Sequence, residues 1–70
     1  MTGHEFIRKL KALAKARQVA VRLDASRGKG SHQTLYFGSA FTIIRNSKDE
    51  LKTGTFHAMC AQLGIKAIDL

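Results

Sequence analysis

The chain has 70 residues, which is enough for one small domain and too few for two hydrophobic cores. Its 12 lysines and arginines outnumber its 5 aspartates and glutamates, so the formal net charge is +7. Because 44% of the residues are hydrophobic, a packed core is feasible and the composition argues against a natively disordered chain. A domain this small cannot enclose both a deep pocket and a dry core. We therefore expect its function to lie on its surface and to involve an anionic partner.

The sequence lacks the segments that mark membrane, secreted and zinc-binding proteins. No apolar run approaches the ~20 residues of a membrane span. The N-terminal residues 1–5 do not have the basic-then-apolar order of a secretion signal. Cys60 is the only cysteine and cannot form an internal disulfide, and three scattered histidines do not make a zinc module. These features favour a single domain over residues 1–70 in a reducing cytoplasm.

The first segment predicts an amphipathic helix of about four turns. Thr2, with Glu5 three residues later, matches a capping box. Behind it, apolar side chains recur at helical spacing: Phe6, Ile7, Leu10, Leu13 and Ala14. Cationic side chains fall on the opposite side of the helix: Arg8, Lys11 and Lys15.

Three strands are expected next. Residues 19–23 alternate and are rich in β-branched side chains, which predicts a strand with Val19, Val21 and Leu23 facing inward. Residues 24–31 contain two glycines and two cations without an apolar pattern, which is typical of a flexible loop. Residues 32–37 and 41–44 predict the second and third strands.

The turn between these two strands sets which residues share a face of the sheet. A two-residue turn pairs Tyr36 with Phe41 and leaves large apolar groups on both faces. A three-residue turn pairs Phe37 with Phe41 and Leu35 with Ile43. We favour the three-residue turn, because it collects all four apolar residues on one face. His32, Thr34 and Tyr36 then lie on the other face.

After a polar surface loop over residues 45–52, a second helix is expected, with Thr53 as its N-cap and Gly64 as its C-cap. Its buried stripe has clean helical spacing: Phe56, Met59, Cys60 and Leu63. The resulting order is α-β-β-β-α, with a three-stranded antiparallel sheet and both helices on one face. This is the arrangement of a double-stranded-RNA-binding-domain-like α+β fold.

His32 is the candidate catalytic residue. Imidazole titrates near pH ~6.5 and can therefore accept or donate a proton at neutral pH. RNA cleavage requires such a base for the 2′-hydroxyl proton, an acid for the leaving 5′-oxygen and positive charge at the phosphate. Arg27, Lys29 and Arg45 could supply that charge, and the loop glycines allow backbone N–H groups to approach a phosphate. The alternative is that His32 is an ordinary exposed strand residue. The composition of the chain, taken alone, favours this alternative.

Three segments together resemble the HicA family of toxins from bacterial toxin–antitoxin systems. They are Glu5-Phe6-Ile7-Arg8-Lys9-Leu10, Gly28-Lys29-Gly30-Ser31-His32 and Leu51-Lys52-Thr53-Gly54-Thr55, and the ending Gln62-Leu63-Gly64-Ile65 also fits. The resemblance covers nearly the whole chain.

The resemblance implies a small endoribonuclease that cleaves mRNA and arrests translation, without a metal or organic cofactor. It implies that His32, in the Gly-Ser-His motif, is essential. It also implies a HicB-type antitoxin that covers the histidine region in a heteromeric complex, and we expect the isolated toxin to be a monomer. The expected RNA-binding residues are Arg27, Lys29, Gly30, Ser31, Tyr36 and Arg45.

The chain departs from the family where many members carry a Pro-x-His stretch after the third strand. Here the corresponding residues are Ile44-Arg45-Asn46-Ser47, so the acid partner of His32 is not identified. Two other functions remain open. One is a non-catalytic module that grips duplex RNA with its basic residues. The other is an interaction protein whose basic face docks an acidic partner.

Overall fold

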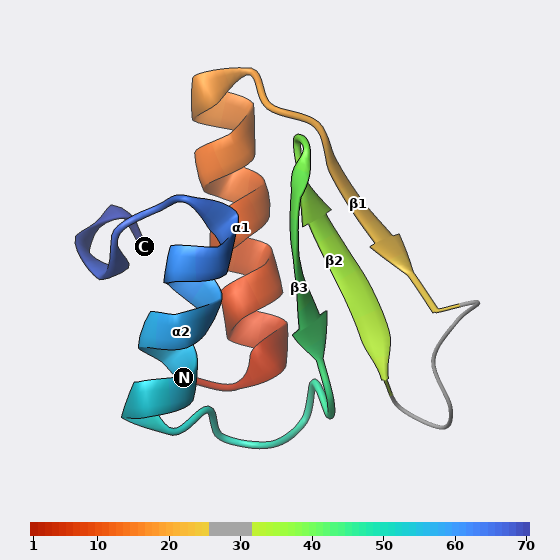
Figure 1. The fold of residues 1–70 in the computed structure, drawn as a ribbon, viewed down its shortest axis with the longest axis vertical. Coiled ribbons are helices and arrows are strands. Elements are labelled where there is room, and N and C mark those ends of the chain that lie inside the picture. Colours follow the sequence, from red (N-terminus) through yellow and green to blue (C-terminus); the bar gives the residue numbers. More distant parts are fainter. Residues whose placement is uncertain (26–31) are drawn as a thin grey trace.

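The computed structural model describes residues 1–25 and 32–70. The chain forms α1 (Gly3–Arg17), β1 (Val21–Asp24), β2 (Gln33–Phe37), β3 (Ala40–Ile44), α2 (Thr53–Leu63) and the short 3-10 helix η1 (Ala67–Asp69). The three strands form one antiparallel sheet in the order β1-β2-β3. Both helices lie on the same side of this sheet (Figure 1). The expected α+β class and α-β-β-β-α order are therefore confirmed.

Helix α1 begins with the predicted capping box. The hydroxyl of Thr2 accepts a hydrogen bond from the Glu5 N–H at 3.2 Å, and the Glu5 carboxylate accepts one from the Thr2 N–H at 3.1 Å. The two bonds satisfy N–H groups that the helix itself leaves without a partner. The hydrogen bond from the Thr2 backbone N–H to the Glu5 carboxylate holds the pKa of Glu5 below its ordinary value.

The hydrophobic core lies between the two helices and one face of the sheet. Its fully enclosed side chains come from α1 and the two longer strands: Phe6, Leu10, Leu35 and Ile44. Helix α2 contributes Met59, Cys60 and Leu63, as its spacing predicts. Burial raises the pKa of the Cys60 thiol, which keeps it in its unreactive protonated form.

The hairpin between β2 and β3 corrects the expected register. The loop has two residues, so Phe37 pairs with Ala40 and Tyr36 with Phe41. Gly38 has a φ of +62°, and no positive φ occurs at Ser39. A glycine in this conformation at the first loop position is typical of a type II′ turn, whose twist matches that of the strands. The turn therefore determines the pairing, and Phe41 is not on the face of Phe37.

The consequence of this register is an open face with apolar side chains. Phe41 is 55% exposed and Ile43 is 44% exposed. The covered face instead receives Thr42, whose hydroxyl donates a hydrogen bond to the Gln62 side-chain oxygen on α2. This bond allows a polar side chain to be buried there without losing its partner.

Other expectations are corrected in detail. Leu23 lies on the covered face as expected, because it pairs with the fully buried Leu35, but β1 is an edge strand and Leu23 stays 37% exposed. Thr53 was expected to be the N-cap of α2, whereas Lys52 occupies that position and its side chain makes no capping hydrogen bond. The C-cap at Gly64 is confirmed. Strand β1 begins at Val21 instead of residue 19.

The start of α1 is held against the loop that follows β3. The His4 N–H donates to the Ser47 carbonyl at 2.8 Å, and the amino terminus forms an ion pair with the Glu50 carboxylate. A Cβ atom on Gly3 would lie 2.7 Å from the Ser47 Cα, so only glycine allows this approach. Within the described residues, neither helix has the length and apolar character to cross a bilayer.

Candidate functional site

His32 lies directly before β2, and its side chain is exposed. It is therefore available to a ligand without any rearrangement of the core. Side chains two residues apart along a strand lie on the same face. The positions of His32, Thr34 and Tyr36 have this spacing. The expectation that His32 stands outside the core at the start of a strand is confirmed.

Four of the expected RNA-binding residues cannot be placed relative to His32. Arg27, Lys29, Gly30 and Ser31 lie outside the described residues. Their assignment therefore stays a prediction from the sequence. Arg45 directly follows β3, is exposed and lines a hollow between β3 and α2.

Tyr36 is the centre of a row of side chains across the open face. The pairing aligns Arg22 of β1, Tyr36 of β2 and Phe41 of β3. The Arg22 guanidinium carbon lies 4.3 Å from the centroid of the Tyr36 ring. On its other side, the centroid of the Phe41 ring lies 6.0 Å away, with the two planes tilted by 47°. A cation and two aromatic rings therefore meet on this face.

A second row lies beside the first and is closer to the His32 end of β2. It consists of Asp24, Thr34 and Ile43. The Asp24 carboxylate lies 3.7 Å from an Arg22 guanidinium nitrogen, which links the two rows at the β1 edge. The open face thus combines one ion pair with exposed apolar groups.

The two remaining histidines are parts of the framework. The His4 imidazole nitrogen lies 3.2 Å from the Ser47 hydroxyl, at the start of α1. The His57 ring centroid lies 5.5 Å from that of Phe56 on α2. Both side chains are exposed, and both provide matched controls for a substitution at His32.

The sequence reasoning missed Phe41 and Ile43 as surface residues. Apolar patterning alone predicts that both face the core, because it gathers the apolar residues of the hairpin on one face. The dipeptide Gly38-Ser39 carried the signal, since Gly-Ser between two strands is typical of a two-residue hairpin. With that turn, strand alternation places both side chains beside Tyr36.

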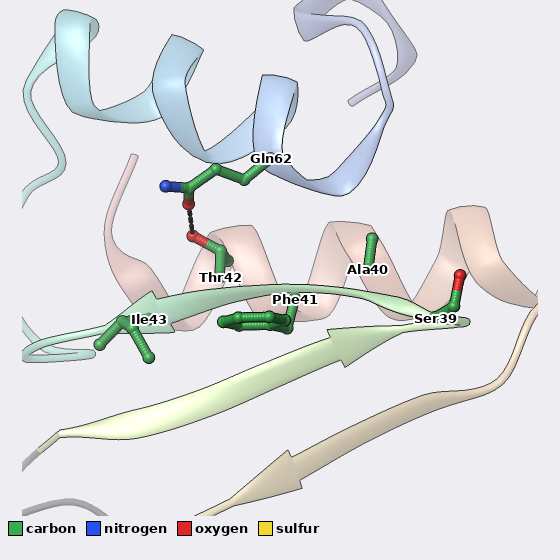
Figure 2. Close-up of a pocket in the computed structure, with 6 residues that line it drawn as sticks. All are labelled: Ser39, Ala40, Phe41, Thr42, Ile43 and Gln62. Atoms are coloured by element: carbon green, nitrogen blue, oxygen red, sulfur yellow. Dashed lines mark hydrogen bonds between the residues drawn. The ribbon is translucent and has the colours of Figure 1, made fainter.

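Two adjoining hollows follow the outer edge of β3. The smaller, of about 340 Å³, is lined by Ser39, Ala40, Phe41, Thr42, Ile43 and Gln62. The larger, of about 560 Å³, continues toward the loop after β3 and α2, and both hollows share Thr42, Ile43 and Gln62. In Figure 2, Thr42 points toward Gln62 while Phe41 lies on the other side of the strand.

Comparison with known protein families, with curated proteins and with solved structures gave no match.

Proposed function

We propose that this protein is a HicA-type toxin, a small metal-independent endoribonuclease that cleaves mRNA in the cytoplasm. The observation that supports this best is His32, which stands exposed at the start of β2 in a strongly basic chain. The Gly-Ser-His motif and the α-β-β-β-α order fit the same proposal. The finer fold, double-stranded-RNA-binding-domain-like, belongs to the proposal as well.

In the proposed reaction, His32 exchanges a proton with the RNA at the scissile phosphate. As a base, it removes the 2′-hydroxyl proton, so that the 2′-oxygen attacks phosphorus and the bond to the 5′-oxygen breaks. The products are a 2′,3′-cyclic phosphate and a 5′-hydroxyl, whose proton comes from a protonated side chain or from water. Arg27 and Lys29 hold the phosphate, with the backbone of Gly30 and Ser31 beside them.

The open face positions the substrate in this proposal. The Tyr36 ring is partly exposed between Arg22 and Phe41, and RNA bases stack on aromatic side chains and on guanidinium planes. Arg45 adds positive charge beyond the end of β3. A strand of RNA that reaches His32 could therefore place a neighbouring base on this row.

The same proposal includes an antitoxin of the HicB type. A free chain with a net charge of +7 binds RNA indiscriminately, so a resting cell needs a partner that covers this charge. An acidic partner over the His32 region would remove both the catalytic group and the phosphate-binding charge. We expect the isolated toxin to be a monomer.

The experiment is cleavage of a labelled RNA by the purified full chain in the presence of EDTA. Wild type and His57→Ala should cleave at similar rates, whereas His32→Ala should be slower by about 10² to 10⁴-fold, the usual contribution of a general acid or base. A substrate with 2′-deoxyribose at the cleaved position should resist cleavage. Equal rates for His32→Ala and wild type would reject the catalytic assignment, and tight binding without cleavage would favour a non-catalytic RNA-binding module.

A further inference from the structure

The two edges of the sheet are protected to different degrees. Strand β1 carries two charged residues, Arg22 and Asp24, among its four positions. Strand β3 is Ala-Phe-Thr-Ile-Ile, with no charge and no proline. Its pairing with β2 runs without interruption from Ala40 to Ile44, so no bulge twists it away. Natural proteins usually protect an exposed edge with charges, proline or bulges, and β3 has none of these devices.

The backbone groups on the outer side of β3 belong to Phe41 and Ile43. In a two-residue hairpin, the pair that closes the turn, here Phe37 and Ala40, exchanges hydrogen bonds. The alternation then directs the N–H and C=O groups of Thr42 and Ile44 toward β2, and those of Phe41 and Ile43 outward. The Gly38 N–H, which donates to the Ala20 carbonyl of the β1 side at 2.8 Å, fits this alternation.

No strand of the described chain pairs with this outer side, because β3 ends the order β1-β2-β3. The two adjoining hollows lie beside it, and Figure 2 shows the residues that line the smaller one. A peptide strand added here would lie about 4.8 Å from β3. Alternate side chains of that peptide would enter the hollows below α2, and the others would line up with Phe41 and Ile43 on the open face.

We infer that the outer edge of β3 is a strand-addition site for an extended, acidic segment of a partner protein. Backbone hydrogen bonds to Phe41 and Ile43 would supply affinity, and the two hollows would select the alternate side chains. The added strand would also cover part of the Phe41 and Ile43 side chains, which are now about half exposed.

The charge of the chain favours an acidic partner over a second copy. Pairing two β3 strands would bring together two chains of net charge +7. The larger hollow is lined by Arg45 and Lys52 as well as by Asp49 and Glu50, and Glu50 is already paired with the amino terminus. An acidic strand is therefore attracted by the net charge of the whole molecule, while the cations and carboxylates that line this hollow are equal in number.

This inference is independent of RNA cleavage, since it depends only on the edge of β3, the hollows and the charge. It therefore holds or fails separately from the role of His32. A chain that binds such a strand without cleaving RNA would support the inference while rejecting the proposed function.

The test uses a short capped peptide of alternating valine and glutamate, added to the full chain, with amide hydrogen exchange measured by NMR. The amides of Phe41 and Ile43 should exchange at least about tenfold more slowly when the peptide is saturating. The outward amides of the other edge, Val21 and Leu23, should not change and serve as the internal control. The same peptide with lysine in place of glutamate should bind at least about tenfold more weakly at low salt, with a smaller difference at high salt.

A variant makes the test specific for the backbone. Ile43→Pro removes one outward N–H group at an edge position that tolerates proline, and it should weaken peptide binding, whereas Ile43→Val should not. The exchange measurement on the unaltered chain keeps the inference testable if Ile43→Pro does not fold.

Three results would overturn the inference. Protection that is equal at Val21 and Leu23 would mean non-specific binding. A concentration-dependent dimer in sedimentation, with Phe41 and Ile43 already protected, would assign the edge to a second copy. Protection of these two amides by a single-stranded RNA oligonucleotide, and not by the peptide, would make the edge a nucleic-acid surface.

Discussion

The two faces of the sheet carry similar apolar side chains but differ in how far water reaches them. Phe37 on the covered face is 8% exposed, and Phe41, four residues beyond the end of β2, is 55% exposed on the open face. Both belong to the same hairpin, whose two-residue turn places them on opposite faces. Their exposure differs because the two helices cover only one side of the sheet.

This difference separates what holds the molecule together from what it offers to a partner. The covered face removes apolar area from water, which is the main source of folding free energy. The open face leaves Phe41 and Ile43 in water, where they contribute little to stability. Exposed apolar groups that gather on one surface are typical of a binding site.

The largest expected effect is at Phe37. Replacing it with alanine leaves a cavity beneath the helices and should lower the free energy of unfolding by about 3–5 kcal/mol. Urea denaturation followed by circular dichroism measures this change. A loss below about 1 kcal/mol would show that the covered face does not carry the stability of the fold.

A substitution at Gly3 tests how closely the start of α1 packs against the loop that follows β3. A Cβ atom there meets the Ser47 Cα at 2.7 Å, and this backbone atom cannot yield as a flexible side chain would. Gly3→Ala should therefore lower the free energy of unfolding by about 1–3 kcal/mol. The matched control is Gly54→Ala, because a Cβ atom at Gly54 meets nothing within 4 Å. The control should be neutral or slightly stabilising in the same urea experiment.

Phe41→Ala should have a much smaller effect than Phe37→Ala. The substitution removes a cross-strand contact with Tyr36, and such pairs contribute roughly 0.2–1 kcal/mol. The urea midpoint should therefore stay close to that of the wild type. If Phe41→Ala destabilises the chain as much as Phe37→Ala, the contrast between the two faces is wrong.

The smallest effect is the pH dependence of stability, which we assign to the helical layer. Hydrogen bonds from the Thr2 and Lys66 backbones hold the pKa of Glu5 and of Asp69 below their ordinary values of 4.5 and 3.8, and Arg17 adds to the effect at Asp69. Because the folded pKa is lowered, this stabilisation is complete above those ordinary values and is lost as the pH falls through the folded pKa. Urea midpoints across this acid range should fall less steeply in the Glu5→Gln, Asp69→Asn double variant than in the wild type.

The helices could be predicted from the sequence because their signals are local. The capping box of Thr2 and Glu5 and the stripes at helical spacing lie within a few residues of each other. The faces of β2 and β3 could not be predicted by asking where apolar side chains would gather. This protein leaves Phe41 outside and buries Thr42, which the distant Gln62 makes possible.

The candidate site was predictable only in part. His32 could be assigned to the surface at the start of a strand, because it is polar, directly follows a glycine-rich segment and alternates in step with Thr34 and Tyr36. The row of Arg22, Tyr36 and Phe41 could not, since it depends on the register of three strands. The same register directs the backbone groups of Phe41 and Ile43 outward, and the position of β3 at an edge follows only from the strand order.

The most direct measurement for the proposed function is growth after induction of the wild type, His32→Ala and His57→Ala, with total RNA examined from each culture. We expect that the wild type and His57→Ala stop growth and fragment mRNA, while His32→Ala does neither, although it accumulates as a folded protein. Arrest by His32→Ala equal to that of the wild type would contradict this expectation, and so would intact mRNA in all three cultures.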